Sequence, residues 1–98
     1  EFELAGLTKV DSMVVKPPRV AESPINLECK TWKTVELPAA TPNDHNIMVI
    51  GEVVGVHIMD DAIKDNGFID ATLLRPLARL GYLDYSVVDD VFTMSRPK

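Results

Sequence analysis

Apolar and polar residues alternate along two stretches of this chain, and the pattern predicts strands. Residues 25–32 read Ile-Asn-Leu-Glu-Cys-Lys-Thr-Trp, with an apolar or small side chain at every second position. Period-two alternation is typical of a strand with one buried face. Residues 47–59 are apolar on nearly both sides and rich in β-branched residues, which predicts a central strand covered on both faces. Turn-forming residues between positions 38 and 46 predict the loop that joins the two strands.

The helix signals are short. Residues 1–6 predict the last turns of a helix that ends at Gly6, and residues 19–22 favour a single helical turn. Asp70 is a suitable N-cap for a helix whose apolar stripe kinks or restarts at Pro76 and closes at Gly81. A last apolar segment, residues 87–92, is a short helix or a strand. We therefore predict a mainly β (α+β) fold in which an antiparallel, barrel-like sheet carries short helices.

The amino-acid composition and net charge exclude some classes of binding partner. The 98 residues allow one domain, and 15 acidic against 10 basic residues give a formal charge of -5. A polyanion is repelled by this charge, so we expect no nucleic acid and no anionic membrane surface as partner. No run approaches the roughly 20 apolar residues of a membrane span. Cys29 is the single cysteine, which fits a reducing compartment and a cytoplasmic protein.

Known catalytic motifs and single reactive side chains give little indication of catalysis or metal binding. There is no glycine-rich phosphate loop, no G-x-S-x-G elbow and no H-E-x-x-H motif. His45, at the end of the predicted loop, is either a ligand donor or proton carrier, or an ordinary exposed histidine. His57 shares a strand face with Gly51 and Gly55, which favours a partly buried structural role. Cys29 alternates inward with Leu27, which predicts a buried and inert thiol. Two histidines alone make a poor metal site, so we expect none.

The segment from Arg75 to Tyr85 is richer in binding chemistry. Arg75 and Arg79 stand four apart, on one face of the predicted helix, and Gly81, Tyr82 and Tyr85 follow. Arginine suits a phosphate or carboxylate, and tyrosine offers a flat surface to an aromatic ring. The alternative is a helix end with surface arginines and core tyrosines.

Five sequence segments, by their order and spacing along the chain, resemble the C-terminal half of the flavin reductase-like family. They are Glu1-Phe2-Glu3-Leu4-Ala5-Gly6-Leu7-Thr8, Pro18-Arg19-Val20-Ala21-Glu22-Ser23-Pro24, Leu27-Glu28-Cys29, Ile50-Gly51-Glu52-Val53-Val54 with His57, and Arg75-Pro76-Leu77-Ala78-Arg79-Leu80-Gly81. This family is a branch of the FMN-binding split-barrel superfamily. The resemblance implies an antiparallel split β-barrel of which residues 1–98 form the C-terminal part, the N-terminal half being absent or a separate chain.

The resemblance also implies a function. Family members bind FMN at a homodimer interface and pass electrons from NAD(P)H to flavin or to a flavin-linked acceptor. The alternatives are a flavoredoxin-like electron carrier without nicotinamide turnover, and a structural half-domain that needs its N-terminal partner. Either flavin role leaves the redox chemistry to the cofactor, so we expect no catalytic residue.

The same resemblance assigns site residues. Arg79, Gly81, Tyr82 and Tyr85 correspond to a late family motif near the flavin, and we expect them to bind the cofactor. Tyr82 stands where many relatives have a second glycine, which leaves Tyr85 as the other aromatic candidate. His45 corresponds to a position at the mouth of the flavin site, and we expect it to bind the nicotinamide substrate.

Overall fold

A computed structural model describes residues 1–98, and it divides into two compact units, residues 1–57 and 58–98. The elements in chain order are α1 (Phe2–Ala5), β1 (Lys9–Val10), β2 (Arg19–Val20), β3 (Ile25–Leu37), β4 (Asn46–Ile58), the 3-10 helix η1 (Asp60–Ala62), α2 (Ala71–Leu74), β5 (Leu77–Arg79) and β6 (Tyr85–Val87). The strands form three two-stranded antiparallel sheets, β1–β2, β3–β4 and β5–β6. The predicted mainly β fold with short helices is therefore confirmed.

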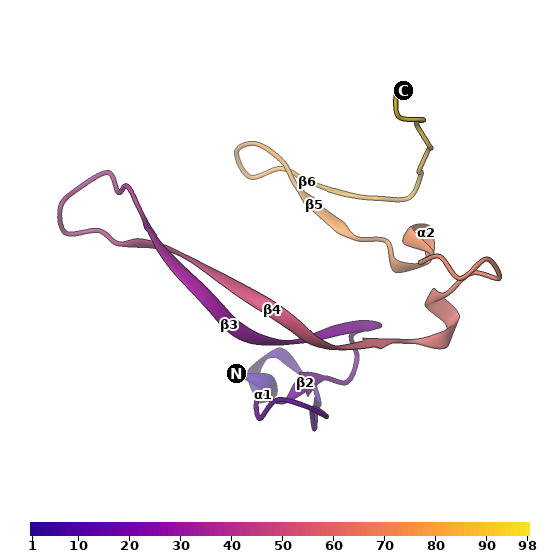
Figure 1. Cartoon of the computed structure of the whole chain (residues 1–98), viewed down its shortest axis with the longest axis horizontal. Coiled ribbons are helices and arrows are strands. Elements are labelled where there is room, and N and C mark those ends of the chain that lie inside the picture. The colour runs from indigo at the N-terminus through magenta and orange to yellow at the C-terminus, as the bar shows by residue number, and fades with distance from the viewer. The chain divides into compact units, whose positions relative to one another are not determined.

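The first unit is dominated by the long β3–β4 hairpin, whose strands run side by side in Figure 1. Both strands occur where the apolar pattern predicts them, and the loop between them spans residues 38–45. β4 has a single hydrogen-bonded neighbour, and Val49 and Val53 on it are 62% and 49% exposed. Within residues 1–98 the prediction of a central strand covered on both faces is thus wrong, because β3 is the only strand that pairs with β4 and the exposed valines show that β4 is not covered on both faces.

The start of the first unit confirms one helix signal and corrects another. α1 ends where Gly6 takes a left-handed conformation with φ 70°, which a residue with a Cβ adopts at a cost. Residues 19–22 do not form the helical turn we predicted. Instead Arg19 and Val20 form β2, which pairs with β1 in the register Lys9 with Val20 and Val10 with Arg19. Pro17 and Pro18 impose extended backbone just before β2, and this favours strand over helix.

The second unit begins with η1 and a tight turn. Gly67, the second residue of an Asn-Gly pair, has φ 84° and closes this turn by donating its N–H to the carbonyl of Lys64. The isolated bridge between Ile63 and Ile69 then brings the chain back to α2. Ala62, which lies in η1, is the buried apolar residue of the unit.

α2 is shorter than its apolar stripe suggests. Asp70 caps it as predicted, because its carboxylate accepts the backbone N–H of Leu73 at 3.2 Å. The helix ends after one turn, where Arg75 takes a left-handed conformation with φ 48° ahead of Pro76. The chain then forms β5, so the helix does not restart after the proline and does not reach Gly81. Of the last apolar segment, Val87 belongs to β6, and residues 88–98 form no regular element.

No helix of this chain could span a membrane, since α1 and α2 are each only four residues long.

Candidate functional site

The β5–β6 hairpin brings four of the five predicted site residues together. Its register pairs Arg79 directly with Tyr85, so both side chains lie on the same face of the two-stranded sheet. Gly81 and Tyr82 lie in the turn between the strands. Two backbone hydrogen bonds close this turn: the Leu80 N–H donates to the Asp84 carbonyl at 3.0 Å, and the Asp84 N–H donates to the Gly81 carbonyl at 3.1 Å. The prediction that Arg75 and Arg79 share one face of a helix is wrong, because Arg75 follows the end of α2 and Arg79 lies in β5.

Arg79 is held by both of its neighbouring tyrosines. One terminal guanidinium nitrogen donates a hydrogen bond to the Tyr85 hydroxyl, and the other donates to the Tyr82 carbonyl at 2.8 Å. The guanidinium carbon also lies 4.9 Å from the centre of the Tyr85 ring, within the range of a cation–π interaction. A guanidinium has five N–H groups, so these two bonds leave donors for a further partner. No carboxylate of this unit pairs with Arg79, whereas Arg75 pairs with Asp89 at 2.7 Å.

The two tyrosines present aromatic surface to solvent. Tyr82 is 95% exposed and Tyr85 is 53% exposed. The backbone of Tyr82 has φ 56°, a left-handed conformation that a non-glycine residue adopts only at an energetic cost. The prediction of core tyrosines, the alternative for this segment, is therefore wrong. The hairpin instead displays a positive charge fixed beside exposed aromatic rings.

His45 belongs to the other unit. It ends the β3–β4 loop, where its Nδ1 lies 3.5 Å from a carboxylate oxygen of Glu36. Both side chains are largely exposed, at 69% and 74%. The imidazole is thus open to solvent beside a carboxylate, an arrangement that suits either a binding residue or an ordinary surface histidine.

The residue that the sequence analysis missed is Glu28, in β3. It is only 3% exposed, while the neighbouring Cys29 is exposed and Leu27 is 57% exposed. The prediction that Leu27 and Cys29 point inward and that the thiol is buried is therefore wrong. The alternation is real, but the opposite set of positions faces inward at this point of the strand, because the loop of residues 13–15 covers the face that carries Glu28.

Four hydrogen bonds satisfy the buried carboxylate. It accepts the backbone N–H groups of Met13, Val14 and Val15 at 2.9, 2.6 and 3.1 Å, and it bonds to Nε2 of His57. Successive N–H groups of this kind form an anion-binding concavity. The bond to His57, followed by the backbone bonds, lowers the pKa of Glu28 from 4.5 to about 2. Glu28 is therefore a carboxylate that only accepts, so Nε2 of His57 must carry the proton of their bond.

The predicted structural role of His57 is confirmed, because its side chain is 18% exposed and bonded to Glu28. Gly55, two positions earlier on the same face of β4, explains how Glu28 fits. A Cβ at Gly55 would lie 3.3 Å from Cβ and Cδ of Glu28. A glycine and a histidine two apart in one strand, facing an acidic residue in the other, are the sequence signal that could have revealed this contact.

No three His, Cys, Asp or Glu side chains gather into a group able to hold a metal ion. The guanidinium and the exposed aromatic rings of the β5–β6 hairpin suit a partner that is aromatic or anionic.

Comparison with known proteins identifies the fold. The family described as flavin reductase like domain matches residues 1–84. An uncharacterized protein of Halalkalibacterium halodurans is 39% identical over 97 residues, which cover 99% of this chain and 46% of that protein.

Two solved structures are similar over almost the whole chain. Nitrilotriacetate monooxygenase component B from Bacillus cereus has 30% sequence identity and a TM-score of 0.84, with 95% of this chain and 46% of the other covered. A Shewanella frigidimarina protein assigned as a flavin reductase with a split barrel domain has 29% identity and a TM-score of 0.76, with 98% and 46% covered. The chain thus spans about half the length of these relatives, and its antiparallel strands have the fold of the corresponding part of a split barrel.

Proposed function

Because the chain belongs to the flavin reductase-like family, we propose that it forms part of an FMN-dependent oxidoreductase that passes electrons from NAD(P)H to flavin or to a flavin-linked acceptor. We further propose that residues 1–98 are the C-terminal part of one split-barrel domain. In this proposal the N-terminal half completes the domain, and the protein acts as a cytoplasmic homodimer. Membership of the family supports a flavin-related oxidoreductase function.

The arrangement of Arg79 between two tyrosines is the observation that carries the proposal. Its guanidinium is fixed by two hydrogen bonds, so little side-chain entropy is lost when an anionic partner binds. Tyr82 and Tyr85 expose aromatic surface beside it, and Gly81 leaves open space, since a Cβ there would meet no atom within 4 Å. A positive charge next to flat apolar surface is what an aromatic cofactor with anionic groups requires.

These residues fit FMN in their chemistry. FMN combines an aromatic ring system with a phosphate, and it would supply the hydride and electron transfer when bound. In the proposal Arg79 offers its remaining N–H groups to an anionic oxygen, and Tyr82 and Tyr85 orient the ring by contact. A fixed positive charge near the ring would also favour the anionic, reduced form of a flavin. His45 is proposed to bind the nicotinamide substrate, with the Glu36 carboxylate 3.5 Å from its Nδ1.

The first experiment is a visible absorption spectrum of the intact purified protein, followed by chromatography of the flavin released on heating. We expect a flavin spectrum and release of FMN. Oxidation of NADH and NADPH is then followed at saturating flavin. A protein that binds flavin but never accepts electrons from either nucleotide would be a carrier, and the reductase proposal would be wrong.

A matched pair of variants tests the site. Arg79→Ala removes a charge-assisted contact worth about 1.5–3 kcal/mol, which corresponds to roughly tenfold or greater weakening of FMN binding. Lys64→Ala removes a positive charge from the same unit but outside the hairpin, and we expect it to retain FMN normally. Tyr85→Phe keeps the ring while it removes the hydroxyl that bonds Arg79, so an intermediate loss is expected. Equal retention by the Arg79 and Lys64 variants would remove the hairpin from the flavin site.

A further inference from the structure

The turn between β5 and β6 contains a backbone conformation that its residue does not favour. The Asp84 N–H donates to the Gly81 carbonyl at 3.1 Å, which makes residues 81–84 a β-turn with Tyr82 and Leu83 at its centre. Tyr82 has φ 56°, whereas Leu83 does not have a positive φ. A positive φ at the first central position alone is the pattern of a type II′ turn, and glycine ordinarily occupies that position. In this turn the neighbouring Gly81 does not have a positive φ, and the tyrosine does.

The side chain of Tyr82 does not account for this conformation. It is 95% exposed, so its ring packs against almost nothing that could offset the cost. Strained backbone persists only where the surrounding structure stabilises it. The interaction that the structure shows at this residue is made by its backbone carbonyl, which accepts a hydrogen bond from a terminal nitrogen of Arg79 at 2.8 Å. Because the donor is charged, this bond is stronger than one between neutral groups.

The positive φ and this hydrogen bond are linked by geometry. The angle φ is the rotation about the bond between the backbone nitrogen and Cα, so it sets the direction of the carbonyl that follows. An ordinary negative φ at Tyr82 would turn its carbonyl away from the present direction. The other terminal nitrogen of Arg79 donates to the Tyr85 hydroxyl, and the Tyr85 ring lies 4.9 Å from the guanidinium carbon. One of the contacts that hold the guanidinium therefore depends on the backbone angle of residue 82.

We propose that the left-handed backbone of Tyr82 positions Arg79 for its ligand, and that this role belongs to the peptide carbonyl and not to the tyrosine ring. The inference rests on the proposed function for the identity of that ligand, an anionic group of FMN. Tyr82 is in this sense a positioning residue, since it acts through Arg79. The two anchoring bonds leave three of the five guanidinium N–H groups for the ligand. A guanidinium that is already held loses less conformational entropy when the ligand binds.

Three substitutions of Tyr82 separate the backbone from the ring. Tyr82→Gly, Tyr82→Asn and Tyr82→Val all remove the ring, but glycine and asparagine accept a positive φ and the β-branched valine does not. A difference among the three variants therefore reports the backbone alone. We expect the glycine and asparagine variants to bind FMN alike. We expect the valine variant to bind it roughly tenfold more weakly than these two, because one charge-assisted bond that holds Arg79 is lost.

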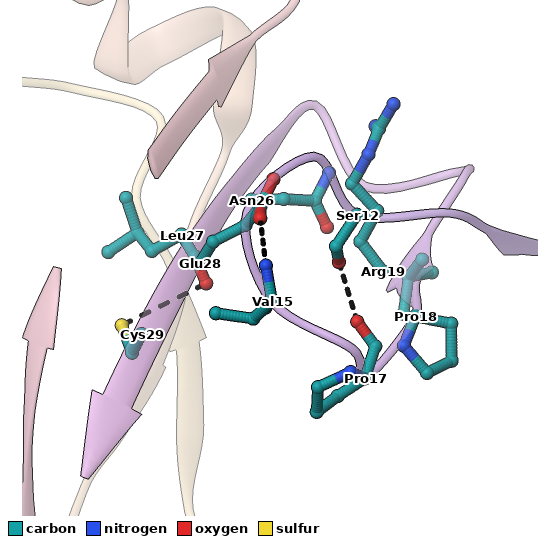
Figure 2. Close-up of a pocket in the computed structure, with 10 residues that line it drawn as sticks. Ser12, Val15, Pro17, Pro18, Arg19, Asn26, Leu27, Glu28 and Cys29 are labelled. Carbon is teal, nitrogen blue, oxygen red and sulfur yellow. Dashed lines mark hydrogen bonds between the residues drawn. The ribbon is translucent and has the colours of Figure 1, made fainter. Parts of the chain in front are cut away.

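Nitrogen NMR of the arginine side chains, recorded on the intact protein without flavin, measures the positioning directly. We expect two separate terminal-nitrogen signals for Arg79, because one nitrogen bonds to the Tyr85 hydroxyl and the other to the Tyr82 carbonyl. Arg19 is the internal reference, since only its Nε is hydrogen-bonded, to the Asp11 carbonyl at 3.3 Å. Figure 2, a close-up of a pocket in the first unit, shows its guanidinium extending away from the other residues drawn. Its terminal nitrogens should give one averaged signal.

The glycine and asparagine variants should keep both Arg79 signals, and Tyr82→Val should show a single averaged one. Leu83→Val is the matched control, because this neighbouring side chain is also exposed, at 84%, and has no positive φ. We expect the control to keep both signals and the FMN affinity of the unaltered protein.

The inference would be overturned if Tyr82→Val kept both Arg79 signals, if the glycine and asparagine variants lost them, or if Leu83→Val merged them as well. Absence of FMN binding by the unaltered protein would instead refute the proposed function. The two failures are distinguishable, because the arginine signals are measured without flavin and decide the role of Tyr82 in either case.

Discussion

Replacing Gly55 with alanine tests whether the Glu28 carboxylate is held where the structure places it. An added Cβ would lie 3.3 Å from both Cβ and Cδ of Glu28 and 3.5 Å from its Cγ. Carbon atoms prefer separations of about 3.5–4.0 Å, so the Glu28 side chain would have to move by a few tenths of an ångström. It cannot do so freely, because the bonds to Met13, Val14 and Val15 fix its carboxylate.

The size of the effect follows from two opposing contributions. Overpacking a fixed site costs about 1–3 kcal/mol. Replacing glycine with alanine restricts the unfolded chain and stabilises the folded protein by about 0.4–1 kcal/mol. We therefore expect Gly55→Ala to lower the free energy of unfolding by about 1–2 kcal/mol.

Urea denaturation of the intact protein, followed by circular dichroism, measures this difference. Gly81→Ala is the control, because a Cβ there meets no atom within 4 Å and the glycine does not have a positive φ. We expect the control to unfold at the same urea concentration as the unaltered protein or slightly above it. If Gly55→Ala were as stable as the control, the close contact and the fixed position of Glu28 would both be wrong.

Three further predictions concern single side chains. The pKa of Glu28 falls from 4.5 in the unfolded chain to about 2 in the fold, so its contribution to stability should be complete above pH 4.5 and be lost as the pH falls towards 2. Urea denaturation at several pH values in this range should show that the free energy of unfolding of Glu28→Gln depends less on pH than that of the unaltered protein. Asp70→Ala should lower the melting temperature because the N-cap bond to Leu73 is lost, while Asp70→Asn should retain most of it, as thermal denaturation can show. Arg75→Gly should be tolerated at the left-handed helix end, whereas Arg75→Val should cost about 1–2 kcal/mol in urea denaturation, although both variants lose the same exposed ion pair to Asp89.

Local structure was predictable wherever neighbouring residues decide it. The long strands β3 and β4 follow from alternation and β-branched content, and their loop follows from its turn residues. The end of α1 at Gly6 and the cap of α2 at Asp70 depend on the backbone or side chain of one residue, so the sequence reveals both. The hairpin residues Arg79 to Tyr85 were also identified as a group, because their binding chemistry is visible in the amino acids themselves.

The element that carries Arg79 was not predictable from periodicity. Leucines at three-to-four spacing continue past Pro76, yet the chain forms a strand there. The pairing of Arg79 with Tyr85 stabilises β5 through hydrogen bonds to a segment that the helical pattern does not include. Since a pattern of apolar residues reports burial and not hydrogen-bond partners, it could not separate a restarted helix from a short hairpin.

Contacts between distant parts of the chain determine which face of β3 is buried. The sequence alone established that residues 25–37 alternate, but either set of positions satisfies that pattern. Glu28 faces inward because the loop at 13–15 offers three N–H groups and β4 offers His57, with Gly55 leaving room. These partners are distant in the chain, and a carboxylate is stable away from water only when such partners converge on it. The local sequence therefore determines that residues 25–37 form a strand, and contacts with distant residues determine which face of that strand is buried.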